Sequence, residues 1–97
     1  MPHKGRGHVA VDADGKVLDA GATYYGAILK AGSGGTSTVT VYDGVSTGGD
    51  VIDYFSAAAS GRDPRWLNEG IILRRGLYVD LGLNVDAFTL YYAPVPA

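Results

Sequence analysis

Three aspartates lie close together in the chain, and paired carboxylates are the groups with which many hydrolases carry out acid–base chemistry. Asp43, Asp50 and Asp53 fall within or directly after the stretch VYDGVSTGGDVI. Such catalysis requires one carboxyl group in an apolar pocket that raises its pKa. The surrounding residues are rich in glycine and hydroxyl side chains and predict no such pocket. We therefore interpret the three aspartates as solvent-exposed turn residues, and we expect that the protein is not an enzyme.

Two further patterns are candidates for metal binding, and both fall short. The stretch VDADGKV is similar to the start of a calcium loop, which requires an oxygen ligand at position five and glycine at position six. Counted from Asp12, these positions hold Lys16 and Val17. His3 and His8 lie on a glycine-rich segment without further ligands, and the chain has no cysteine. The sequence therefore predicts no metal and no other cofactor.

Aromatic and arginine side chains are more informative than the acids. The chain has seven tyrosines and one tryptophan, and two pairs of tyrosines, 24–25 and 91–92, are adjacent in sequence. Neighbouring residues of a strand point to opposite faces, so at least two of these rings must face away from the core. Tyr, Trp and Arg are enriched where two protein surfaces meet. An interface is one interpretation, cover for neighbouring strands is another, and sugar binding by stacked rings is a third, weakened by the single tryptophan.

The first eight residues form a small basic segment on a mildly acidic chain. Lys4 and Arg6 lie there without an acidic neighbour, whereas the whole chain has a net charge of −2. This segment is either an unstructured terminus or an arm that lies on an acidic partner surface. Together with the aromatic and arginine residues above, it completes the set of predicted partner-binding residues: Lys4, Arg6, Tyr24, Tyr42, Arg65, Trp66, Arg74, Arg75, Tyr78 and Tyr91.

The segments that must position these residues read as short strands between turns. Fifteen glycines punctuate runs rich in Val, Ile, Thr and Tyr. Residues 36–43 alternate most clearly, with Val39 and Val41 on one face and Tyr42 on the other. Gly26 inside an expected strand indicates a bulge or a close approach by another backbone. Further strands are expected over 23–31, 51–59, 66–73, 77–81 and 87–93, with a hairpin of 9–11 and 16–18 and a polar loop over 60–65.

The expected fold is all-β, a small antiparallel β-sandwich of about seven or eight short strands. It is jelly-roll-like, with the strand order left open, and has an extended N-terminal arm over residues 1–8 and one domain over residues 9–97. The balance of 8 basic and 10 acidic residues argues against nucleic acid as a partner. No apolar run approaches the roughly 18 residues of a membrane helix, and no signal peptide is visible, so no membrane partner is expected.

Three segments together resemble a known group of proteins. GATYYGAILKAG runs into TVTVYDGVSTGGDVI, and GIILRRGLYVDLG leads to AFTLYY. This pattern, over about residues 21–93, is similar to that of small bacteriophage virion proteins, short β-sandwich modules that coat or adorn capsids and tails. The resemblance implies a capsid decoration (cement) protein that trimerises and bridges neighbouring major capsid subunits on the virion surface, after assembly in the host cytoplasm. It supplies no catalytic residues. The alternative is a tail- or fibre-associated module that binds a host glycan or another virion protein.

Overall fold

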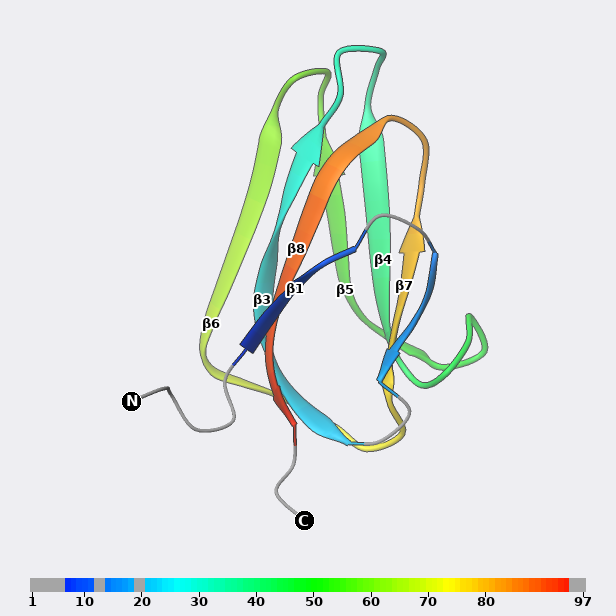
Figure 1. Cartoon of the computed structure of the whole chain (residues 1–97), viewed down its shortest axis with the longest axis vertical. Coiled ribbons are helices and arrows are strands. Elements are labelled where there is room, and N and C mark those ends of the chain that lie inside the picture. Colours follow the sequence, from blue (N-terminus) through cyan, green and yellow to red (C-terminus); the bar gives the residue numbers. More distant parts are fainter. Residues whose placement is uncertain (1–6, 12–13, 19–20, 95–97) are drawn as a thin grey trace.

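The computed structural model describes residues 7–11, 14–18 and 21–94, and every regular element in this part of the chain is a β-strand (Figure 1). Because none of the described residues lies in a helix, none of them forms a helix able to cross a membrane. The strands are β1 Gly7–Ala10, β2 Gly15–Leu18, β3 Ala22–Ala31, β4 Ser37–Asp43, β5 Asp50–Ala57, β6 Arg62–Leu73, β7 Leu77–Leu81 and β8 Val85–Pro94.

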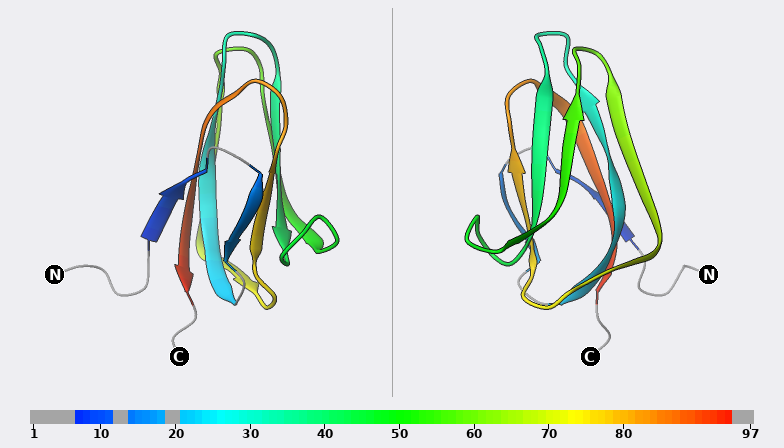
Figure 2. Two further views of the ribbon diagram at one scale, coloured as in Figure 1. Left: turned by 45° about the vertical axis from the view of Figure 1, so that its right-hand side comes forward. Right: turned by 180° about the vertical axis from the view of Figure 1, so that it is seen from behind.

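The strands form two four-stranded sheets, in the orders β1-β8-β3-β6 and β2-β7-β4-β5, and every pairing is antiparallel. The first strand pairs with the last, the second with the seventh, the third with the sixth and the fourth with the fifth. A chain that pairs in this nested way is one long hairpin rolled into two layers, which is the jelly roll. The two views of Figure 2 show the layers and the loop between β4 and β5 that projects from one end. The sequence left this topology open, and the strand order now establishes it.

The core lies between the two layers and is made from the alternate residues of the strands. Val39 and Val41 are fully buried, as their alternation with threonines predicts. Phe55 of β5 meets Phe88 of β8 edge to face, with ring centroids 5.1 Å apart, so the pair joins the two sheets. The core cluster is Tyr24, Ala27, Leu29, Ala31, Val39, Val41, Phe55, Ala57, Leu73, Leu77, Val79, Phe88 and Leu90.

Gly26 is the centre of the largest irregularity in the sheets. On one side of β3, Tyr24 pairs with Ile71 but Gly26 pairs with Trp66, so residues 67–70 of β6 stand opposite Tyr25 alone. A Cβ at Gly26 would overlap the carbonyl oxygen of Arg65, and its φ of 123° disfavours any other residue. Both readings of this glycine, a bulge and a close approach of backbone, are confirmed.

Three local predictions are wrong. Residues 9–11 and 16–18 form no hairpin, because β1 pairs with β8 in one sheet and β2 pairs with β7 in the other. Residues 60–65 are not a loop throughout, because β6 begins at Arg62; its Pro64 is tolerated since β6 is the last strand of its sheet and one side needs no ladder hydrogen bonds. Gly7 and His8, assigned to the N-terminal arm, belong to β1 and pair with Tyr92 and Tyr91.

Candidate binding surfaces

The predicted partner-binding residues do not form one cluster. Trp66 and Tyr91 lie on the outer side of the sheet β1-β8-β3-β6, whereas Tyr42 and Tyr78 lie on the outer side of the other sheet. Both surfaces contain exposed rings, so the expectation that several tyrosines face away from the core is confirmed. We treat the two surfaces separately and then turn to the predicted residues that lie on neither.

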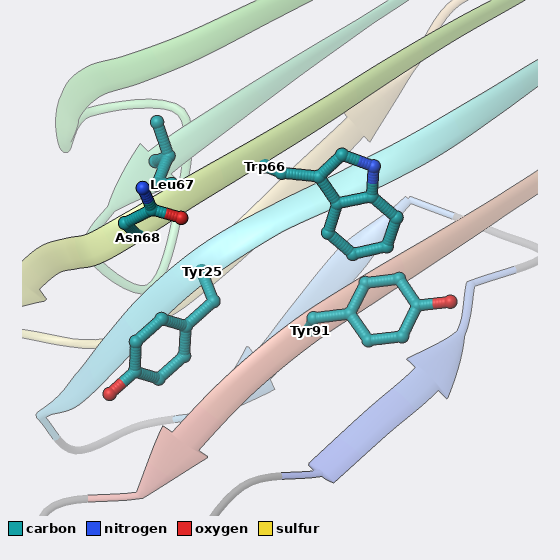
Figure 3. A pocket seen from close by; sticks show the side chains of 5 residues that line it. All are labelled: Tyr25, Trp66, Leu67, Asn68 and Tyr91. Carbon is teal, nitrogen blue, oxygen red and sulfur yellow. The ribbon is translucent and has the colours of Figure 1, made fainter.

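The first surface is a hollow of about 250 Å³, and we call it the aromatic hollow. Its lining residues are Tyr25, Trp66, Leu67, Asn68 and Tyr91 (Figure 3). The tryptophan is 61% exposed. Figure 3 shows the rings of Trp66 and Tyr91 side by side on the face of the sheet and the ring of Tyr25 at some distance from them on β3. The hollow therefore has aromatic rings on more than one side and an amide, that of Asn68, on its rim.

The irregular register around Gly26 produces this hollow. Trp66 of β6 and Tyr91 of β8 both pair with Gly26, so only a glycine separates them across the sheet. With no side chain between them, the two rings approach to a centroid distance of 4.9 Å and cover the glycine. The additional residues of β6, which include Leu67 and Asn68, then carry the strand past Tyr25 and leave the hollow.

The second surface, the tyrosine face, consists of Tyr42, Val51, Tyr54 and Tyr78 on the outer side of the sheet β2-β7-β4-β5. Tyr42 and Tyr78 are paired in register on β4 and β7, and their rings meet edge to face with centroids 6.0 Å apart. Val51 and Tyr54 on β5 are 61% and 54% exposed. The β4–β7 register runs without a shift from Val39 to Tyr42, whereas the β4–β5 register shifts by one residue between Val41 and Tyr42, so that Ile52 is an additional residue of β5. The sequence placed Tyr42 opposite Val39 and Val41, and this is confirmed.

Two predicted residues point into the sandwich instead. Tyr24 is completely buried, so it is not part of a partner-binding surface, and that prediction is wrong. Its hydroxyl donates a hydrogen bond to Asp53 Oδ2 at 2.9 Å. Burial, and next the negative charge of Asp53, raise the pKa of Tyr24 far above its usual range. The outward ring of the adjacent pair is that of Tyr25.

Arg65 is the other inward residue, and it joins the two sheets. It forms an ion pair with Asp53 of β5 and a second one with Asp63 at 3.3 Å, while its guanidinium lies 4.5 Å from the centroid of the Phe55 ring. The side chain of Asp53 is only 8% exposed, so the interpretation of this aspartate as a solvated turn residue is wrong. No buried side-chain nitrogen or oxygen among the described residues lacks a partner, which fits a structural role for this network.

Arg74 and Arg75 lie in the turn that carries the chain from β6 in one sheet to β7 in the other. Their backbone N–H groups donate to the carboxylate of Asp43, at 3.1 and 2.9 Å. Burial alone would raise the pKa of Asp43, but the hydrogen bonds from Arg75, Arg74 and Gly76 outweigh it and hold the pKa below its usual value. The guanidinium of Arg75 pairs with Asp50 at 2.9 Å in an exposed position, and the Arg74 side chain is exposed. The backbone N–H groups of Arg74 and Arg75 are therefore bonded to Asp43, and the arginine side chains are the groups that this turn exposes.

The loop between β4 and β5 is a strand connection, as expected. Ser46 Oγ accepts a hydrogen bond from the Gly48 N–H at 3.1 Å within this loop, whereas the Asp43 carboxylate accepts hydrogen bonds from the β6–β7 turn. Among the described residues no group of three or more His, Cys, Asp or Glu side chains is arranged to hold a metal ion. Lys4 and Arg6 lie outside the described residues, so their predicted role stays a prediction.

Sequence reasoning missed Tyr25, Leu67 and Asn68 as parts of a site. Two glycines with positive φ point to them: Gly26 of β3, which stands opposite Trp66, and Gly70 of β6, which ends the irregular stretch 67–70. Comparison with family models, with curated proteins and with solved structures gave no match to this chain in any of the three cases. The chain's function must therefore be inferred from its own residues.

Proposed function

We propose that this chain is a structural module without catalytic activity, a phage capsid decoration (cement) protein that docks on the major capsid shell through its tyrosine face and bridges neighbouring subunits. The exposed aromatic and apolar side chains of that face carry the proposal. The edge-to-face pair of Tyr42 and Tyr78 lies beside Val51 and Tyr54 of β5, which are 61% and 54% exposed. Tyrosines of this kind are typical of the centres of protein interfaces. The sequence resemblance to small phage virion proteins supplies the partner.

The surroundings of the tyrosine face support the same role. Arg74 and the Arg75–Asp50 pair lie beyond the end of β4 that carries Tyr42 and add charge at the rim of the face. A polar rim around an apolar centre is the usual anatomy of an interface. In this proposal the basic residues Lys4 and Arg6 add contacts to an acidic shell, and self-association into a trimer supplements the limited core of a 97-residue chain.

Co-sedimentation with assembled shells of the capsid protein encoded nearest to this gene tests the proposal. We expect the chain to pellet with the shells, and Tyr54→Asp, which puts a charge on the tyrosine face, to weaken binding by more than about tenfold. Ile72→Ala is the matched control, since Ile72 is 70% exposed on β6 of the other sheet, and it should bind as the wild type does. A chain that is strictly monomeric by light scattering and has no affinity for the shells contradicts the proposal.

A second candidate is a module of the phage tail or fibre that binds a host glycan or another virion protein. The aromatic hollow favours it, because that site has the size of a small ligand and not of a protein surface. Gene position separates the two candidates: a neighbouring major capsid gene supports decoration of the head, and neighbouring tail genes support the second candidate.

A further inference from the structure

We propose that the aromatic hollow binds one neutral sugar ring of a glycan, stacked on Trp66 beside Tyr91 and held at its edge by the amide of Asn68. This site lies on the sheet opposite the tyrosine face, so the inference does not depend on the docking role proposed above; it rests on the second candidate function and specifies its ligand. A molecule attached to a shell by one face would present the other to its surroundings.

The size of the hollow fits a single ring. Its volume of about 250 Å³ is slightly below the roughly 300–1,000 Å³ typical of pockets for drug-sized ligands. The hollow is short, because residues 67–70 of β6 leave the β3 ladder only between its pairings with Tyr24 and Gly26. An extended peptide requires a long groove with several successive pockets, and this hollow offers one.

The lining supplies the two kinds of contact that a sugar requires. A pyranose ring has an apolar face of C–H groups and an edge of hydroxyl groups. The electron-rich face of an aromatic ring attracts such weakly positive C–H groups, and tryptophan offers the largest ring face. Trp66 keeps 61% of its surface exposed, so this ring face is accessible. Asn68 offers both a donor and an acceptor to the hydroxyl edge.

The charge around the hollow selects a neutral ligand. Tyr25, Trp66, Leu67, Asn68 and Tyr91 carry no formal charge, and the nearest acidic residue in sequence is Glu69, which is exposed next to Asn68. A nucleobase also stacks on aromatic rings, but the lining offers no cation to the phosphate of a nucleotide. A neutral sugar requires no such cation.

Cover of the sheet backbone explains only part of this arrangement. Rings that lean over a strand glycine stabilise the sheet, and the contact of Trp66 with Tyr91 over Gly26 is of this kind. The same contact holds the tryptophan ring in place, so a ligand that stacks on it loses less conformational entropy on binding. Covering the glycine requires neither Asn68 nor the hollow between these rings and Tyr25, and a ligand site accounts for both.

Tryptophan fluorescence is the direct test, because the single tryptophan of the chain is Trp66. The probes are the methyl glycosides of glucose, galactose, mannose and N-acetylglucosamine, with glucuronic acid as a charged match for glucose, adenosine monophosphate and a proline-rich peptide. We expect one of the neutral sugars to change the emission saturably in the millimolar range or below, and glucuronic acid to bind less well than glucose.

Calorimetric titration of variants then assigns the site. Asn68→Ala and Tyr25→Ala should each weaken sugar binding by about tenfold, since each removes one polar or stacking contact from the hollow. Tyr54→Ala, on the tyrosine face, should bind the sugar as the wild type does. Urea unfolding midpoints of all three variants establish that the changes are local.

Three outcomes overturn the proposal. The first is no response to any neutral sugar up to the millimolar range, in fluorescence or on a glycan array. The second is sugar binding that survives both Asn68→Ala and Tyr25→Ala. The third is preferential binding of the peptide or of adenosine monophosphate. None of these outcomes changes the expected binding to capsid shells, which is tested separately by co-sedimentation of the wild type and Tyr54→Asp. The failure of one proposal is therefore distinguishable from the failure of the other.

Discussion

The two outer faces of this jelly roll carry similar residues, but they differ in shape. One has Trp66 and Tyr91 at a centroid distance of 4.9 Å around a hollow of about 250 Å³. The other has Tyr42 and Tyr78 at 6.0 Å, edge to face, on adjacent strands. Residue type alone therefore does not decide whether a hollow forms beside such rings.

Strand register is what separates them. Tyr42 and Tyr78 face each other directly on adjacent strands in an unbroken ladder. Trp66 and Tyr91 lie on strands that flank β3, and they meet because Gly26 between them has no side chain. The β4–β5 ladder shifts by only one residue beside Tyr42, whereas four residues of β6 stand opposite Tyr25 alone. The larger insertion pulls the backbone of β6 aside and leaves the hollow. The size of the insertion thus distinguishes the two faces.

The largest loss of stability is expected from Gly26→Ala, because this substitution changes the residue at the centre of the register shift between β3 and β6. The new Cβ would overlap the carbonyl oxygen of Arg65 at a φ of 123°, so we expect a loss of at least about 3 kcal/mol in the free energy of unfolding. Urea denaturation measures it. Gly48→Ala is the control, because the nearest atom to its Cβ would be Ser46 Oγ at 3.4 Å; it should change stability by about 0.5 kcal/mol or less. An unchanged midpoint for Gly26→Ala would contradict the close approach on which the hollow depends.

The next effect concerns the polar bridge that fixes β6 against the other sheet. Asp53→Ala leaves the Arg65 guanidinium with only the longer pair to Asp63 and leaves the Tyr24 hydroxyl without its acceptor. Because the Asp53 carboxylate is almost fully buried, we expect a loss of about 2–3 kcal/mol. Asp50→Ala breaks an exposed ion pair, 59% and 78% accessible on its two sides, and should cost under about 0.5 kcal/mol. Equal urea midpoints for the two variants would refute the bridge.

The regular strands and the buried Asp53 differ in how far the sequence could predict them. The strands over 36–43 and 77–81 were predictable because buried valines and leucines alternate there with more polar residues, and this pattern is local to each strand. Asp53 was misread because its partners, Tyr24 and Arg65, come from other strands, and no local pattern announces a buried ion pair. The outward positions of Tyr42 and Tyr78 followed from the alternation of their own strands.

The aromatic hollow and the sheet order were less predictable. Gly26 indicated an irregularity in its own strand. The residues that line the hollow beside it, Leu67 and Asn68, lie on β6, and their position depends on the long-range pairing of β6 with β3. The expected hairpin of 9–11 and 16–18 failed for a related reason, since the Asp-Gly pair favours a tight turn locally whereas pairing of β1 with β8 and of β2 with β7 closes the roll. Long-range pairing overrides local turn preference here.

A smaller effect distinguishes the buried tyrosine from the exposed ones. Tyr24→Phe removes the hydrogen bond to Asp53 and should cost about 1 kcal/mol at neutral pH. Since the folded pKa of Tyr24 is raised, its contribution is fully present below the unfolded pKa of about 10 and is lost as the pH rises above it. At about 1.4 kcal/mol per pH unit, the advantage of the wild type over Tyr24→Phe should vanish within about one unit above pH 10.

Urea midpoints measured from neutral to alkaline pH test this expectation for Tyr24. Tyr54→Phe is the control, because the ring of Tyr54 is 54% exposed on the tyrosine face, and its midpoints should follow those of the wild type throughout. If the difference between wild type and Tyr24→Phe stays constant through the alkaline range, the hydroxyl is not buried against Asp53, and the face on which the ring lies must be reassigned.

An effect of similar size is expected at the turn where the chain passes from the sheet with the hollow to the sheet with the tyrosine face. Asp43→Asn weakens the acceptor for the backbone N–H groups of Arg74 and Arg75, which we expect to lower stability by about 1 kcal/mol at neutral pH. The folded pKa of Asp43 is lowered, so this contribution is present above its ordinary pKa of 3.8 and is lost as the pH falls through the folded pKa. The difference in stability between wild type and variant should therefore be constant above about pH 5 and shrink below about pH 4.

Asp86→Asn, which breaks the exposed 3.3 Å pair with Lys30, is the control and should stay within about 0.5 kcal/mol of the wild type. A gap for Asp43→Asn that does not shrink in acid would mean that its carboxylate charge does not hold the turn, and that the two faces are joined here by the backbone alone.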